Sequence, residues 1–98
     1  MEAKETNLKD AYVVTTPRFA DDRGFFLESF SLQKFRDVTG AMDDFVQDNH
    51  SKSSKGVLRG LHYQIIQPQG KLVRCIKGEI FDVAVDIREG SKSFGEWV

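Results

Sequence analysis

The segment from Lys71 to Ile87 constrains the fold more than any other part of this 98-residue sequence. Apolar and polar side chains alternate over residues 71–76 and again over residues 79–87, and Lys77-Gly78 lies between the two runs. Such alternation is typical of a strand with one buried face, and a two-residue linker that contains glycine favours a hairpin. The sequence therefore predicts an antiparallel sheet. Strands that alternate with long helices are absent, which argues against a doubly wound α/β fold.

Other short segments rich in β-branched and aromatic residues extend this prediction along the chain. Turn-forming residues at Asp21–Gly24 and Glu89–Ser91 separate some of them. The further strands are expected at residues 11–16, 25–30, 45–47, 57–66 and 94–98. About six or seven short strands spaced roughly 8–12 residues apart are typical of an antiparallel sandwich or barrel.

The sequence contains a single good helix candidate. Ser31 is a residue type that caps helix N-termini, and Gly40 stands where a left-handed residue would end the helix. Between them Leu32, Phe35 and Val38 recur every three residues and form one apolar stripe. We therefore expect an all-β domain with one short helix.

Composition narrows the class of protein. Lysine and arginine number 14 against 15 aspartates and glutamates, so no net positive field favours nucleic acid or a membrane surface. No apolar run approaches the roughly 20 residues of a membrane span. Residues 1–10 are polar and lack the apolar core of a signal peptide, so we expect a cytoplasmic protein. Met1–Lys9 is predicted to be a lead-in that is frayed or docked on a partner.

Metal and thiol chemistry find little support in the sequence. His62 lies in the triplet His62-Tyr63-Gln64, where glutamine is a poor transition-metal ligand, and a lone strand histidine is more often structural than catalytic. The other histidine, His50, lies in a polar loop. Cys75 is the only cysteine, which excludes an internal disulfide, and alternation favours a small buried hydrophobe at that position. We therefore predict no metal and no cofactor.

Several cations of the sequence suit an anionic ligand, and two of them, Arg59 and Lys71, lie near His62. Arg23, Arg59, Lys71 and Arg74 could bind a diphosphate through charge-assisted hydrogen bonds. The alternative for each is a solvated surface charge, and for Arg74 that alternative is favoured. Strict alternation would place Arg59 and His62 on opposite faces of a strand. Both reach one site only if the strand bulges or twists, and Gly60 is the plausible place for that.

Four long segments resemble one known family in order and spacing. The sequence from about residue 11 to residue 98 resembles the N-terminal half of the dTDP-4-dehydrorhamnose 3,5-epimerase family, which belongs to the cupin superfamily. The segments that carry the resemblance are DDRGFFLESF (21–30), FVQDNHSKSSKGVLRGLHYQ (45–64), QGKLVRCIKGEIFDVAVDIREGS (69–91) and FGEWV (94–98).

The resemblance implies a cupin-type jelly roll, a single domain over residues 1–98 and a homodimer. It implies an isomerase that needs no metal and inverts C3 and C5 of a dTDP-linked 4-keto-6-deoxy sugar in the synthesis of the dTDP-L-rhamnose precursor. Both carbons adjoin the C4 ketone, so a base can remove a proton and leave an enolate. Some relatives invert one centre only, and the resemblance does not decide between one and two.

The resemblance also implies roles for individual residues. His62 in LRGLHYQ matches the base, and Lys71 in QGKLVR matches the residue that faces the C4 oxygen. Phe26 could stack on thymine, or be an ordinary core or interface aromatic. The residues that match substrate contacts, some of which come from a partner subunit in the family, are Arg23, Glu28, Gln47, Asp48, Asn49 and Arg59.

This sequence departs from the family pattern at its C-terminal end. In the family, the tyrosine that serves as the acid and the carboxylate that orients the histidine come later than the position that matches Val98. Tyr12 and Tyr63 match neither of these two residues. Three hypotheses therefore stay open: an epimerase, a truncated dTDP-sugar-binding module without turnover, and a fragment of a longer enzyme. Deuterium uptake, dTDP binding and the mass of the intact protein distinguish them.

Overall fold

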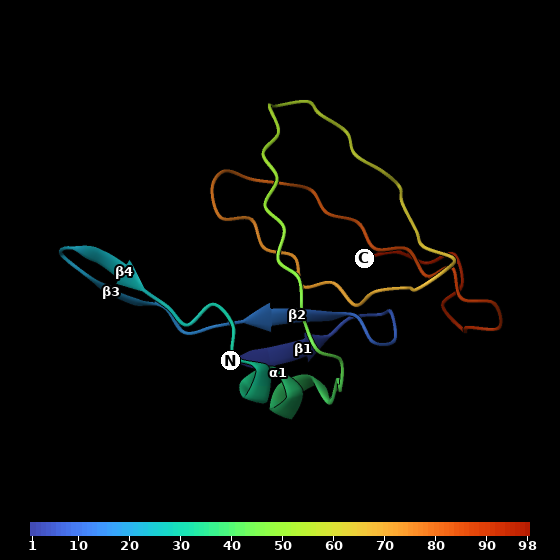
Figure 1. Ribbon diagram of the computed structural model, residues 1–98, viewed down its shortest axis with the longest axis horizontal. Helices are drawn as coiled ribbons and strands as arrows, with labels where there is room; N and C mark the ends of the chain where they lie inside the picture. The colour runs from blue at the N-terminus through green and yellow to red at the C-terminus, as the bar shows by residue number, and fades with distance from the viewer.

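The regular elements all lie in the first 40 residues of the chain, as seen in a computed structural model that describes residues 1–98 (Figure 1). Two antiparallel strand pairs precede one helix. The first pair is β1 (Glu2–Glu5) with β2 (Tyr12–Thr15), the second is β3 (Phe19–Asp21) with β4 (Gly24–Phe26), and the helix is α1 (Leu32–Thr39).

The β1–β2 pair corrects the prediction of a frayed lead-in. Glu2 lies opposite Thr15 and Glu5 opposite Tyr12, so the first residues belong to a sheet. The connecting loop is held by the Thr6 hydroxyl, which donates to the carbonyl of Ala11 over 2.9 Å. Leu8 in this loop is one of only two buried apolar residues. Polar composition concealed the strand, because an edge strand with little burial needs no apolar face.

The predicted turn at residues 21–24 is confirmed as the tip of the β3–β4 hairpin. Phe19 lies opposite Phe26, and Gly24 has a φ of +131°, which favours glycine over any other residue. In Figure 1 the hairpin extends away from β1 and β2. β4 ends at Phe26, so the predicted strand over residues 25–30 is present only at its start.

Helix α1 is confirmed together with both caps. The Ser31 side chain accepts from the backbone N–H of Lys34, and Gly40 adopts a left-handed φ of 71° while its N–H donates to Arg36. Phe35 is buried and the rest of the apolar stripe is half-buried. The Phe35 ring packs edge-on against Phe45, with ring centroids 5.3 Å apart, so the helix anchors the start of the next segment.

The long segment after the helix is extended but unpaired. Residues 58–83 make no backbone–backbone hydrogen bond, so the strands predicted at 57–66 and 71–76 do not form. The strand predicted at 79–87 is paired only from Ala84 onward, and the hairpin predicted at Lys77-Gly78 is absent. The strand predicted at 45–47 is also absent. Alternation specifies extended backbone, but a strand also needs a neighbour about 4.8 Å away, and no segment of the chain takes that place here.

The end of the chain forms a pairing that the sequence did not predict, between parts of the two strands expected at 79–87 and 94–98. Val85 bridges Trp97, and Ala84 and Val98 exchange both backbone hydrogen bonds at 3.0 Å. The predicted turn near Gly90 lies between the two segments. These residues form an antiparallel hairpin, in agreement with an all-β chain that has one short helix.

The chain as a whole is open. Its radius of gyration is 15.4 Å, against about 13 Å for a compact domain of 100 residues. Only Leu8, Phe35, Asp86 and Ser93 are buried, and every residue from Val46 to Asp82 is exposed. The segment that carries most of the predicted site residues is therefore accessible along its whole length.

Candidate functional site

All eight predicted site residues are exposed, and they lie in two regions. Two lie on or just after the β3–β4 hairpin. The other six lie on the extended segment after α1, which rises from the helix and turns back in Figure 1. The complete set is Arg23, Glu28, Gln47, Asp48, Asn49, Arg59, His62 and Lys71.

Arg59 is held by two neutral acceptors. Its Nε donates to the hydroxyl of Ser53 over 2.9 Å, and one terminal nitrogen reaches the carbonyl of Lys52 over 3.4 Å. Neither partner carries a negative charge, so the positive charge of the guanidinium is not neutralised within the protein. Such a cation is available to a carboxylate or a phosphate.

Lys71 has the same kind of environment. Its ammonium donates to the side-chain oxygen of Gln69 over 3.3 Å and has no carboxylate within ion-pair distance. Gln69 lies two residues earlier on the same extended segment, with Gly70 between them. The charge of Lys71 is therefore available to a negatively charged oxygen of a ligand.

The residues before this segment form a small polar group. The Gln47 amide donates to the side-chain oxygen of Asn49 over 3.1 Å, and Asp48 lies between them. Alternation on an extended backbone places Gln47 and Asn49 on one side and Asp48 on the other. These side chains present donors and acceptors of the kind that bind a nucleobase or a sugar hydroxyl.

Arg23 and Glu28 differ from the other candidates because each is engaged in an ion pair. The Arg23 guanidinium pairs with Asp21, and this contact holds the pKa of the Asp21 carboxyl below its usual value. Glu28 pairs with Lys34 of α1 over 2.9 Å. Since Arg23 is 90% exposed, its ion pair is well solvated and weak enough to exchange for a ligand.

A shallow hollow of about 420 Å³ lies on the β3–β4 hairpin and is the nearest feature to a pocket beside these residues. Arg23 and Phe26 line it together with Phe19 and Phe25. Arg18 lies outside the lining, 4.2 Å from the centre of the Phe25 ring. Exposed aromatic rings next to a cation suit a planar, anionic ligand such as a nucleotide.

His62 is exposed and makes no hydrogen bond with any of residues 1–98. Gly60, the position where a bulge or twist was expected, adopts a φ of +120°, which favours glycine. His50 likewise makes no hydrogen bond. The histidine that the sequence singles out is therefore free to meet a ligand but has no group that fixes its tautomer or ring angle.

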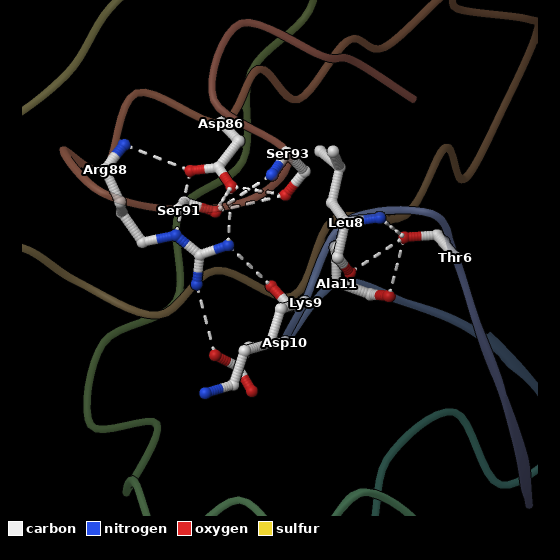
Figure 2. A network of polar contacts seen from close by, with 9 residues as sticks. All are labelled: Thr6, Leu8, Lys9, Asp10, Ala11, Asp86, Arg88, Ser91 and Ser93. Carbon is white, nitrogen blue, oxygen red and sulfur yellow. Dashed lines mark hydrogen bonds and ion pairs between the residues drawn. The ribbon is translucent and has the colours of Figure 1, made fainter.

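The sequence did not predict the network of hydrogen bonds and ion pairs around Asp86 (Figure 2). The Asp86 side chain is 1% exposed and accepts from the hydroxyls of Ser91 and Ser93 and from the Arg88 guanidinium. These contacts, led by that of Arg88, hold the pKa of Asp86 far below its usual range. Serines just after a turn could have signalled such a contact.

The prediction of a buried cysteine is wrong. Cys75 is exposed, and its thiol donates to the carbonyl of Lys77. The side chain is exposed because residues 71–76 do not pack against another strand. No group of three or more His, Cys, Asp and Glu side chains is arranged to hold a metal ion. The eight-residue α1 is neither long nor apolar enough to span a bilayer.

Comparison with known proteins identifies the family. The profile of the family described as dTDP-4-dehydrorhamnose 3,5-epimerase matches residues 5–98. Enzymes of that name from Shigella flexneri and Pseudomonas aeruginosa are 56% and 55% identical over the whole of this chain, which covers 55% and 54% of their lengths. The chain therefore belongs to the dTDP-4-dehydrorhamnose 3,5-epimerase family and spans about half the length of these relatives.

Solved structures agree with this assignment. The chain matches the epimerase of Legionella pneumophila in complex with dTDP-4-keto-L-rhamnose with a TM-score of 0.94 and 52% identity, over 99% of this chain and 52% of that one. It matches the dTDP-4-dehydrorhamnose 3,5-epimerase of Elizabethkingia anophelis with a TM-score of 0.84 and 48% identity, over 100% of this chain and 54% of that one. The path of this chain is therefore close to that of the corresponding half of these enzymes.

Proposed function

We propose that this protein is an isomerase that acts on a dTDP-linked 4-dehydro-6-deoxy-hexose and inverts its C3 and C5 centres through an enolate. The observation that carries the proposal is the family match over residues 5–98. A structural relative at 52% identity binds dTDP-4-keto-L-rhamnose, which supports a nucleotide-linked keto sugar as the ligand.

Proton removal is assigned to His62. The C4 ketone acidifies the protons on both neighbouring carbons, because the charge left behind is delocalised onto the ketone oxygen. Imidazole is the side chain that most often serves as a general base, and general-base catalysis contributes roughly 10²–10⁴-fold. Return of a proton on the opposite face requires an acid, and neither Tyr12 nor Tyr63 is proposed for that step.

Stabilisation of the enolate is assigned to Lys71. Its ammonium is held by a neutral amide oxygen and keeps its full charge for the C4 oxygen. A donor aimed at an oxygen that gains charge in the transition state contributes about 3 kcal/mol when water is excluded from the site. The bound substrate itself would exclude some of the water from the site.

Binding of the nucleotide is assigned to the remaining candidates. Arg59 would bind near the diphosphate and sugar, because its guanidinium has neutral partners and can form a two-pronged contact with phosphate oxygens. The other proposed contacts to substrate are Arg23, Glu28, Gln47, Asp48 and Asn49. Phe26 is proposed to stack on thymine, which is supported by its position in the hollow of the hairpin.

The architecture of the whole protein is part of the proposal. We infer a single cupin-type jelly roll to which residues 1–98 contribute, assembled as a cytoplasmic homodimer. The antiparallel hairpins and the structural likeness to two epimerases support the jelly roll. The hairpin β3–β4, with three exposed phenylalanines, offers a surface suited to a second subunit.

The decisive experiment follows exchange at carbon. The protein is incubated with dTDP-4-dehydro-6-deoxy-glucose in D₂O, and deuterium at C3 and C5 is followed by NMR. Uptake at both carbons supports double inversion, uptake at one carbon indicates a single-centre epimerase, and no uptake by a folded protein refutes the enzymatic proposal.

A second candidate function is binding of the nucleotide sugar without turnover. It is favoured by one observation, namely that no residue of the chain hydrogen bonds to His62 and fixes its tautomer. Calorimetric titration with dTDP separates the two. Binding without deuterium uptake supports this second function, whereas the absence of binding contradicts both.

A further inference from the structure

Arg59 is anchored along one edge of its guanidinium only. Nε and Nη2 lie on the same edge, and these are the two atoms that reach the Ser53 hydroxyl at 2.9 Å and the Lys52 carbonyl at 3.4 Å. Nη1, at the end of the group, has no protein partner in the chain. The end of the guanidinium at Nη1 is thus the part left for a ligand.

We propose that Ser53 is a positioning residue that orients Arg59 for the anionic part of the substrate. This inference rests on the proposed function, in which Arg59 binds near the diphosphate. Arginine side chains have many rotamers, and ordering one on ligand binding is costly. A hydroxyl that accepts from Nε removes part of that freedom before the ligand arrives.

The chemistry of the partner explains why a serine suits this task. Arg23, Arg36 and Arg88 each pair with a carboxylate, which compensates their charge and competes with any anionic ligand. The hydroxyl of Ser53 is neutral, so it fixes the Nε edge and leaves the charge intact. Ser53 does not itself touch the substrate in this proposal.

The test compares single and double variants of the protein expressed from its complete gene. Ser53→Ala removes the acceptor, Ser53→Thr keeps it, and Ser54→Ala is the matched control, because the Ser54 side chain makes no hydrogen bond. The affinity for dTDP is measured by calorimetry, and kcat and KM by deuterium exchange. Circular dichroism and the Tm verify that each variant is folded.

We expect Ser53→Ala to weaken dTDP binding and raise KM by about 3- to 10-fold, with kcat little changed. Ser53→Thr and Ser54→Ala should bind like the wild type. Arg59→Ala should weaken binding more than Ser53→Ala, and adding Ser53→Ala to it should cause no further loss, since no guanidinium is left to orient.

Two results would overturn the proposal. In the first, Ser53→Ala binds dTDP as tightly as the wild type while Arg59→Ala binds less tightly, so that Arg59 acts without Ser53. In the second, Ser53→Ala and Arg59→Ala have independent, additive effects. Neither result contradicts the proposed function, which is refuted separately if the substrate takes up no deuterium in the presence of the wild-type protein.

Discussion

Arg88 donates to the carboxylate of Asp10, 78 positions earlier in the chain, over 3.2 Å. The same guanidinium binds the carbonyl of Lys9 and both oxygens of Asp86 (Figure 2). The loop between β1 and β2 is thereby joined to the turn near the end of the chain. This is the principal long-range polar link in a chain that buries few apolar side chains.

Replacing Asp86 with asparagine should destabilise the protein. The amide keeps one oxygen acceptor and turns an NH₂ group toward the donors of Arg88, Ser91 and Ser93, so several hydrogen bonds are lost in a buried place. We expect the Tm to fall by several degrees. Asp43→Asn is the control, because Asp43 is exposed and makes no hydrogen bond. An equal Tm for both variants would contradict this role of Asp86.

The stability of the protein should depend on pH through the same carboxylate. Asp86 has a folded-state pKa far below its unfolded value of about 3.9, so its contribution is complete above about pH 5. The contribution is lost as the pH falls further and the carboxylate takes up a proton. Urea unfolding at several pH values between about 7 and 2.5 measures this. Asp86→Asn should show a weaker fall below about pH 4, and an unchanged fall would refute the assignment.

Gly40→Ala should destabilise α1 by about 1 kcal/mol, because residue 40 adopts the left-handed conformation that a Cβ disfavours. No atom would clash with the new methyl group, so the cost comes from the backbone alone. Gly70→Ala is the control, since Gly70 has an ordinary φ and open space around it. Denaturant titration gives both free energies of unfolding. A neutral Gly40→Ala would mean that the cap is not maintained in solution.

His62→Ala should abolish most deuterium uptake and lower the exchange rate by about 10²–10⁴-fold, because no other imidazole is proposed as the base. His50→Ala is the matched control, since His50 is also exposed and free of hydrogen bonds. The binding of dTDP should survive both changes. If the two variants lose exchange to the same extent, His62 is not the specific base.

Lys71→Met should slow exchange by about 10²-fold, since the developing charge on the C4 oxygen would lose its cation. The affinity for dTDP should change little, because the ammonium is proposed to face the sugar rather than the nucleotide. Lys77→Met tests whether any exposed lysine of this segment has the same effect. A Lys71→Met variant with full exchange but weak dTDP binding would reassign Lys71 to the nucleotide.

Local signals in the sequence predicted local structure well. Ser31 and Gly40 mark the two ends of α1 because capping depends on a few neighbouring residues. The hairpin turn at Gly24 follows from the same kind of short-range geometry. The family motifs around Arg59, His62 and Lys71 likewise depend only on residue types in order.

Strand pairing was less predictable, because it depends on partners far along the chain. Residues 71–76 alternate as a strand should, yet they pair with nothing, and Cys75 is exposed as a consequence. The polar residues of β1 form a strand that composition did not suggest, because β2 supplies the backbone partners. Alternation describes one strand at a time and carries no information about its neighbour.

The sequence by itself determined the family, the helix with its caps, the hairpin turn and the set of candidate residues, because all of these depend on short stretches of chain. The tertiary structure decided which side chains meet. It brought Arg88 to Asp10, buried Asp86 among hydroxyl donors, and placed the Ser53 hydroxyl against Arg59. Such contacts depend on the path of the chain in space, and local patterns of residue types do not reveal that path.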